Sequence, residues 1–285
     1  MRPLLVFYFC CVYTVGLSAA TLSITDGTNT GVKNPGRFVW SDLVSADPER
    51  AAGFYRELFG WNFNQYDENY SVIRHLDRPI GGITRNQNKS DASVRDRWIS
   101  YISTDDLDQS HNLLLQSGAS TILEPITIKD RGELGVYVGP DGAVFGVIEA
   151  ADGDPEERGA DIGDWIWIEL WSNNPARSAE FYGQLGYEIE RNWASANEDD
   201  KLLTAGGFAR GGIVEGDPRQ EQSAWLLYVR VADVAATVAR AVELGGAQVV
   251  LDGESNNNGD IALIRDPGGS VIAVFRYVNP DGAAQ

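Results

Sequence analysis

The chain has few residues of the kinds that bind transition metals or act as nucleophiles. It contains two cysteines and two histidines among 285 residues. Both cysteines, Cys10 and Cys11, lie in the apolar N-terminal stretch. If that stretch is removed on export, the remaining chain has no disulfide, no thiolate nucleophile and no thiolate metal ligand. An exported protein of this kind depends on its hydrophobic core alone for stability.

Residues 1–20 have the composition of a secretory signal peptide. Arg2 supplies the positive start, residues 4–17 are apolar, and Ser18-Ala19-Ala20 is a small-residue cleavage site. The apolar part is too short for an ordinary membrane span, and no later segment has an apolar run of that length. We therefore expect cleavage and a periplasmic or secreted location, with an uncleaved anchor as the alternative.

Basic residues are also scarce. Without residues 1–20 the chain keeps 22 Lys and Arg against 41 Asp and Glu, a net charge of −19. Nucleic acids and anionic membrane surfaces both select for basic patches. The sequence therefore predicts no nucleic-acid partner and, after signal cleavage, no membrane partner. The acidity is explained by solubility outside the cytoplasm.

Known short catalytic motifs are absent. The sequence has no phosphate-binding glycine loop, no nucleotide fingerprint, no Ser-His-Asp grouping and no zinc-ligand spacing. His75 and His111 have no partner donors at a ligand spacing, so we expect each to have a surface or packing role.

The chain does contain an internal repeat. Residues 38–61, FVWSDLVSADPERAAGFYRELFGW, return at an offset of 127 as residues 165–187, WIWIELWSNNPARSAEFYGQLGY. Self-similarity over this length indicates two copies of one structural unit. The matched pairs include Trp40 and Trp167, Asp42 and Glu169, Leu43 and Leu170, Pro48 and Pro175, Arg50 and Arg177, and Phe54-Tyr55 and Phe181-Tyr182.

Each copy predicts a strand, a turn and a helix. The alternation around Trp40 and Asp42 is typical of a strand. Asp47 can cap the helix that starts at Pro48, and Gly60 fits the left-handed position at its end. Asn174-Pro175 and Gly186 serve the same purposes in the second copy.

The rest of each repeat predicts a second strand–helix unit, each helix being followed by about three strands. Four such units would pair into two curved mixed sheets with concave faces and with helices outside, an α+β fold. We expect a signal peptide (1–20), a flexible tether (21–36), a first domain (37–150), an acidic, glycine-rich linker (151–163), a second domain (164–278) and a tail (279–285).

The ordered pieces W-x-[DE]-L, [DN]-P, A-x-F-Y, G-[WY] and a PDG or DPGG turn resemble the vicinal-oxygen-chelate superfamily. This superfamily comprises glyoxalases, bleomycin- and fosfomycin-resistance proteins and extradiol dioxygenases, and the closer likeness is to tandem two-domain bacterial members. The resemblance covers residues 38–150 and 164–277. It implies four βαβββ modules and a cup-shaped pocket in each domain.

Superfamily enzymes hold a divalent metal that the substrate chelates through two adjacent oxygens. The resemblance places the ligand positions of this chain at residues whose side chains do not bind metals. We therefore expect no metal cofactor, although a divalent metal held by relocated ligands stays an alternative. These positions are Trp40, Ile99, Gly146 and Gly82-Ile83 in the first repeat, and Trp167, Leu226, Ala273 and Gly212-Ile213 in the second.

Asp42 and Glu169 lie two residues beyond Trp40 and Trp167, on the same face of each strand. If that face lines a pocket, each acid could accept a ligand's amine or hydroxyl, bind a metal or act as a general base. The alternative is a structural carboxylate that accepts hydrogen bonds from backbone N–H groups or a nearby indole.

Tryptophans recur at matching places in both repeats. Trp40, Trp98, Trp167 and Trp225 would form aromatic pocket walls suited to a flat or apolar ligand. Core packing is the alternative.

The sequence therefore predicts an exported, monomeric protein that binds a small aromatic or apolar molecule without metal. The alternatives are a lyase or oxidoreductase of glyoxalase or dioxygenase type with relocated carboxylate ligands, or a metal-free acid–base enzyme using Asp42 or Glu169. A third reading is a structural or interaction module with no pocket.

Overall fold

The computed structural model describes residues 21–86, 96–193, 195, 197–216, 222–250 and 259–277. The predicted signal peptide, residues 1–20, and the predicted tail, residues 279–285, lie outside these ranges. Within them, no helix combines the length and the apolar character that a membrane crossing requires.

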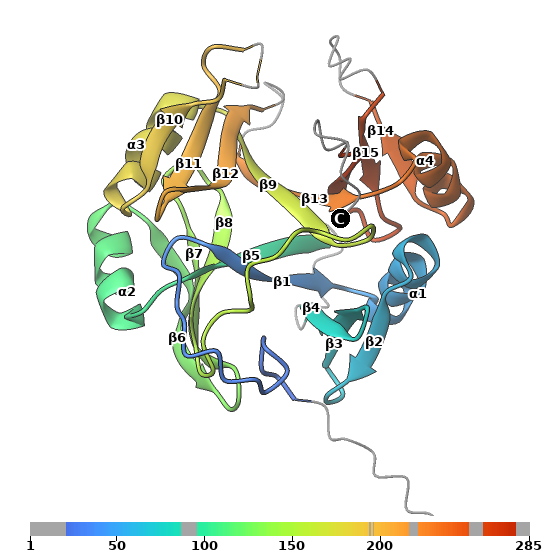
Figure 1. Ribbon diagram of the computed structural model, residues 1–285, viewed down its shortest axis with the longest axis horizontal. Helices are drawn as coiled ribbons and strands as arrows, with labels where there is room; N and C mark the ends of the chain where they lie inside the picture. The colour runs from blue at the N-terminus through green and yellow to red at the C-terminus, as the bar shows by residue number, and fades with distance from the viewer. Residues whose placement is uncertain are drawn as a thin grey trace, which may run out of the picture.

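The described chain forms two eight-stranded mixed sheets, one from each repeat (Figure 1). The strand order is β2-β3-β4-β1-β5-β8-β7-β6 in the first sheet and β10-β11-β12-β9-β13-β16-β15-β14 in the second. The first sheet has β1 (Phe38–Ser45), β2 (Asn62–Gln65), β3 (Tyr70–His75), β4 (Arg78–Arg85), β5 (Arg97–Ser103), β6 (Ser120–Ile128), β7 (Gly132–Val138) and β8 (Val144–Ala150). The second has β9 (Trp165–Ser172), β10 (Glu188–Arg191), β11 (Lys201–Ala205), β12 (Phe208–Glu215), β13 (Ala224–Arg230), β14 (Ala247–Val249), β15 (Ile261–Arg265) and β16 (Val271–Phe275).

Each sheet joins two βαβββ modules, as the sequence predicts. In the first sheet, β1 pairs in parallel with β4 of its own module and antiparallel with β5 of the next. In the second sheet, β9 pairs in the same two ways with β12 and β13. The α+β tandem fold is therefore confirmed.

The four helices are α1 (Pro48–Phe59), α2 (Leu107–Gln116), α3 (Pro175–Gln184) and α4 (Val234–Glu243), and they lie at the periphery of Figure 1. The side chain of Asp47 accepts a hydrogen bond from the Arg50 N–H at 3.1 Å. Asn174 caps α3 by the same contact with Arg177. Gly60 ends α1 at a φ of 74°, a left-handed conformation that suits glycine. The predicted helix starts are thus correct.

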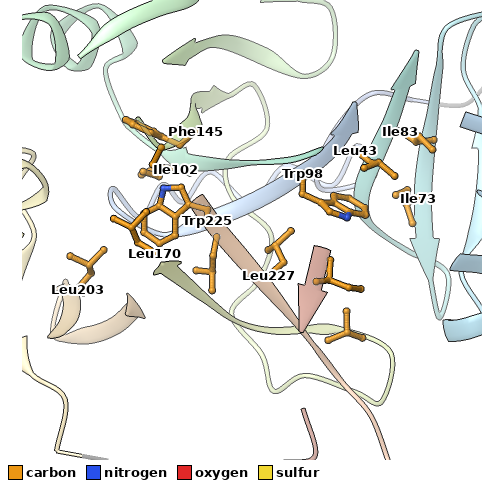
Figure 2. Packing of buried hydrophobic residues seen from close by; sticks show 14 of the residues in the cluster. Leu43, Ile73, Ile83, Trp98, Ile102, Phe145, Leu170, Leu203, Trp225 and Leu227 are labelled. Carbon is orange, nitrogen blue, oxygen red and sulfur yellow. The ribbon is translucent and has the colours of Figure 1, made fainter. Parts of the chain in front are cut away.

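One face of each sheet contributes to a shared aromatic core (Figure 2). The rings of Phe38 and Trp225 have centroids 4.8 Å apart, and those of Trp98 and Trp165 are 5.0 Å apart. The Tyr55 hydroxyl of the first domain donates to the Asp266 carboxylate of the second at 2.9 Å. The two domains therefore fold against each other and are not separate units on a flexible linker.

The first domain and the start of the second are also tied by polar contacts. The indole N–H of Trp61 donates to the Gly163 carbonyl at 2.8 Å. His75 is buried, and its Nδ1 lies 2.7 Å from an Asp164 carboxylate oxygen. Because this histidine fixes two segments far apart in sequence, its role is packing.

Residues 21–36 differ from the expected flexible tether. Leu22 and Ile24 are buried in the cluster on the concave face of the first sheet. Asp152 and Asp154, beyond the end of β8, accept hydrogen bonds from Ser23 Oγ at 2.9 Å and the Asn34 N–H at 2.7 Å. The polar composition of residues 21–36 led to the prediction of a tether. Two buried apolar side chains are nevertheless enough to hold this short segment against the sheet.

We predict that Ile24→Ala lowers the free energy of unfolding by about 2–4 kcal/mol, because it leaves a cavity under the N-terminal segment. Val32→Ala, in the same segment but 54% exposed, is the matched control and should change it by less than about 0.5 kcal/mol. Urea unfolding measures both. Equal effects of the two variants would show that the segment does not pack against the concave face of the first sheet.

Candidate functional site

The concave faces of the two sheets, called here the first and second cups, are built from equivalent residues. Trp40 and Asp42 point from β1 into the first cup, and Trp167 and Glu169 point from β9 into the second. The indole of each tryptophan donates a hydrogen bond to the acid two residues later, at 2.8 Å for Asp42 and 3.0 Å for Glu169. A structural carboxylate that accepts a hydrogen bond from a nearby indole was one of the alternatives predicted for Asp42 and Glu169.

The first cup is filled by a side chain of the protein itself. The Arg131 guanidinium lies 2.8 Å from an Asp42 carboxylate oxygen, and both side chains are almost fully buried. Its Cζ atom lies 5.1, 5.6 and 5.3 Å from the ring centroids of Trp40, Tyr70 and Tyr101. The cation is therefore held by three aromatic rings and one carboxylate.

This arrangement keeps Arg131 charged. Burial is the largest influence and lowers the pKa of the guanidinium, but Asp42, Tyr70 and Tyr101 together outweigh it, so the pKa is raised. The Tyr70 hydroxyl donates to Asp42 at 2.6 Å and accepts from Arg131 at 2.8 Å. Two buried charges are thus paired and hydrogen-bonded, as stability requires.

The turn between β6 and β7 directs Arg131 into the cup. Asp130 has a φ of 63° and Gly132 a φ of 113°. A Cβ atom on Gly132 would lie 2.1 Å from the Glu149 carbonyl oxygen, so the close approach requires glycine. Sequence reasoning missed Arg131 because an arginine in a polar hairpin turn is ordinarily exposed; its only signal is the flanking Asp130 and Gly132.

The second cup keeps the acid and two of the three rings. Glu169 is half-buried and accepts hydrogen bonds from Trp167 and from the Tyr228 hydroxyl. Tyr228 stands at offset 127 from Tyr101. The buried indole N–H of Trp171 has no hydrogen-bond partner within the described ranges, although this side chain influences the pKa of Glu169.

No cation accompanies Glu169 among the described residues: the salt bridges found there do not include it. Asn258 stands at offset 127 from Arg131, and residues 251–258, LDGESNNN, contain no Lys or Arg. The strand register places Asp200 where the first cup has Tyr70, because Leu202 and Val72 pair with equivalent glycines, Gly212 and Gly82. The second cup therefore has an additional acid and lacks the arginine.

The charge balance affects the titration of Glu169. Burial raises the pKa of Glu169, hydrogen bonds from Tyr228 and Trp167 lower it, and the nearby Asp200 charge raises it further, with a raised pKa as the result. Burial together with the Glu169 charge raises the pKa of Tyr228 well above its ordinary value. Glu169 thus keeps its proton to a higher pH than an ordinary glutamate does.

Two cavities open beside these residues. One, of about 600 Å³, extends over the second cup and includes Trp171, Leu226, Leu263 and Val271 in its wall. The other, of about 590 Å³, lies between the N-terminal segment, the linker and both domains, and includes Trp40 and Trp167. Glu169 lies on β9 between Trp167 and Trp171, and its cross-strand partner is Leu226.

Trp98 and Trp225 have a different position from the other candidate residues. Both belong to the core between the sheets, where their indoles donate to Tyr55 at 3.1 Å and Tyr182 at 3.0 Å. Only their edges border the 600 Å³ cavity. Packing is therefore their main role, and the candidate site reduces to the concave-face residues.

Two family models match the sequence. Residues 166–275 match the model of a glyoxalase-like domain, and residues 37–74 match that of a bleomycin resistance protein-like N-terminal segment. The first match spans nearly all of the second repeat, the other covers the opening of the first repeat, and both agree with the observed modules. The chain belongs to the vicinal-oxygen-chelate superfamily.

Two similar proteins match this chain over most of their own length. CFP32 of Mycobacterium tuberculosis, provisionally named a glyoxylase, is 26% identical over 246 residues, which are 83% of this chain and 93% of that protein. The anthracycline biosynthesis protein DnrV of Streptomyces peucetius is 26% identical over 263 residues, 84% of this chain and 93% of its own.

Solved vicinal-oxygen-chelate structures share the fold. The Mn(II)-bound glyoxalase from Novosphingobium aromaticivorans superposes with a TM-score of 0.59 at 14% identity, covering 87% of this chain and 84% of that one. Homoprotocatechuate 2,3-dioxygenase from Brevibacterium fuscum gives a TM-score of 0.58 at 13% identity, covering 88% and 85%. Identities this low show the fold alone.

The residues at the superfamily's metal positions do not fit a divalent metal. A Cβ atom on Gly146 would lie 2.2 Å from the Tyr101 ring, and one on Gly82 would lie 1.9 Å from the Tyr70 hydroxyl. Aromatic side chains therefore take the space that ligands would need in the first cup. Among the described residues, no group of three or more His, Cys, Asp or Glu side chains is placed to hold a metal ion.

We predict that Arg131→Met lowers the free energy of unfolding by about 3–5 kcal/mol, because it leaves the Asp42 charge buried without a partner. The matched control is Arg158→Met, which breaks a half-exposed pair with Asp161 and should cost less than about 1 kcal/mol. Urea unfolding compares them.

The double variant Asp42→Leu with Arg131→Met should be more stable than Arg131→Met alone, because an apolar pair removes the unpaired charge. If Arg131→Met unfolds at the same urea concentration as the wild type, the buried ion pair of the first cup does not exist in solution.

A second prediction concerns pH. Since the folded-state pKa of Glu169 is raised, the folded state keeps a proton that the unfolded chain has lost, and stability falls as pH rises from below 4.5 through the folded pKa. Glu169→Gln should remove this component and lose less stability than the wild type over that interval. Glu180→Gln, on the exposed surface of α3, should follow the wild-type curve. Parallel curves for wild type and Glu169→Gln would contradict the raised pKa.

Proposed function

We propose that this protein binds a small molecule of aromatic or apolar character in its second cup, without a metal ion. The observation that supports this most strongly is the difference between the cups. The first holds Arg131 and is covered by the N-terminal segment, whereas the second presents a half-buried acid beside a cavity of about 600 Å³.

The wall of the second cup suits such a ligand. Trp171, Leu226, Leu263 and Val271 give the cavity apolar walls, as ligand pockets of this volume usually have, and Asp96, Arg97 and Arg265 also border it. Glu169, with its two donors Trp167 and Tyr228, is a polar point that could fix the orientation of a ligand. Trp40 and Asp42 are not part of this proposal, because their partners within the first cup are complete.

A second candidate function is acid–base catalysis by Glu169. The raised pKa favours it, because a general base works best when its pKa is near the working pH. The glyoxalase and dioxygenase names of similar proteins are consistent with this candidate, but they give no additional support for a catalytic role of Glu169. The described residues supply Glu169 with its hydrogen-bond donors and a second acid, Asp200, whose carboxylate accepts from Ser195 and Asn197; they do not make a complete catalytic set.

The proposal retains export and a monomeric state. Residues 1–20 have the composition of a cleavable signal peptide. Two domains that share one core would supply to each other the partner that a single domain needs by dimerising.

The test is binding of N-phenyl-1-naphthylamine, a neutral aromatic probe whose fluorescence rises in apolar sites. We expect saturable binding, weakened about tenfold by Trp171→Ala, because the cavity loses an aromatic wall. Trp193→Ala, which removes a tryptophan that is 78% exposed, should bind as the wild type does.

A competition panel of neutral aromatic compounds extends the same assay to other shapes. Absence of saturable binding across the probe and the panel would overturn the proposed function. Equal weakening by Trp171→Ala and Trp193→Ala would place the binding outside the second cup.

A further inference from the structure

The first cup shows what the ring-and-acid arrangement of this fold binds. Its occupant is a guanidinium cation, contacted by Trp40, Tyr70 and Tyr101 through their faces and by Asp42 through an ion pair of 2.8 Å. Arg131 belongs to the turn after β6, at some distance along the chain from the residues that hold it. Its guanidinium group is therefore bound in the first cup as a separate ligand would be. Planar cations over aromatic faces, next to a carboxylate, are favoured in dry surroundings.

The second cup has equivalent groups at three of these positions, and no basic side chain occupies it among the residues that the structure describes. Trp167 matches Trp40, Glu169 matches Asp42 and Tyr228 matches Tyr101 at the repeat offset of 127. The register places Asp200 where Tyr70 stands, so one ring is replaced by an acid. The local charge changes accordingly, from one acid with one arginine to two acids with no described basic partner for Glu169.

We propose that the second cup binds an organic cation, a guanidinium or an alkylammonium group attached to an aromatic or apolar body. The cationic head would take the place that Arg131 takes in the first cup, on Glu169 and the rings of Trp167 and Tyr228. The body would extend along the concave face into the cavity lined by Trp171, Leu226 and Leu263. This inference rests on the proposed function and names the class of its ligand.

Two features point the same way. Glu169 is half-buried and has no cation partner among the described residues, and the first cup uses the same residue types to hold a cation. The net charge of the chain also attracts cations over a distance.

Binding should depend on pH in a defined direction. The groups that face Glu169 within the described ranges are Tyr228 on β13, Asp200 before β11, and the neutral indoles of Trp167 and Trp171. A cation binds the ionised carboxylate, so affinity should rise with pH as Glu169 loses its proton, and binding should release protons over that interval.

The experiment compares phenylguanidinium with phenylurea, which has nearly the same shape and no charge. Isothermal titration calorimetry of the purified protein at low salt should give at least tenfold tighter binding of phenylguanidinium. In Glu169→Gln the preference should fall below about threefold, whereas the matched control Glu180→Gln, exposed on α3, should keep it. Titrations in two buffers of different ionisation enthalpy should reveal the proton release.

Equal affinities for the two probes would overturn the cation inference while leaving small-molecule binding intact. A preference for phenylguanidinium that survives in Glu169→Gln would also overturn it, because the cation would then bind elsewhere. If neither probe binds, the inference fails, and N-phenyl-1-naphthylamine binding decides separately whether the proposed function survives.

Discussion

A buried cation determines the character of the first domain. Removing the Arg131 guanidinium from water has a large desolvation cost, which is offset only if a carboxylate and further contacts surround it. Asp42, three aromatic rings and the Tyr70 hydroxyl meet that condition. These groups come from three different strands, β1, β3 and β5, so their contacts with Arg131 connect the two modules of the first sheet. The N-terminal segment then covers the cup, because Leu22 and Ile24 can be buried beside these rings.

The two domains show how one fold can serve two purposes. The shared aromatic core is formed by one face of each sheet, and the two repeats make equivalent contacts in it. The indole of Trp98 donates a hydrogen bond to Tyr55, and that of Trp225 donates one to Tyr182. The opposite faces diverge at few positions. The sequence has Asn258 at offset 127 from Arg131, and the register places Asp200 where Tyr70 stands, so the described part of the second cup is acidic and has no ion pair on Glu169. Core packing therefore conserves the architecture while the concave faces acquire separate chemistry.

Much of the fold could be predicted, since the repeat fixes two domains and Asp47 and Asn174 mark helix starts by chemistry that acts locally. The site was harder. Side-chain alternation correctly placed Asp42 beside Trp40, but no local pattern reveals that Arg131, 89 residues away, pairs with Asp42. Likewise Leu22 and Ile24 lie in a polar segment, and their burial depends on a cup formed by distant strands. Contacts between distant residues, rather than local propensity, decide which cup is open.

The most direct test of the account is a crystal structure of the protein soaked with phenylguanidinium. The account predicts Arg131 on Asp42 in a closed first cup, and electron density for the added cation on Glu169 between Trp167 and Tyr228. Density for the probe in the first cup, or a second cup closed by the chain's own side chains, would contradict the asymmetry on which the account depends.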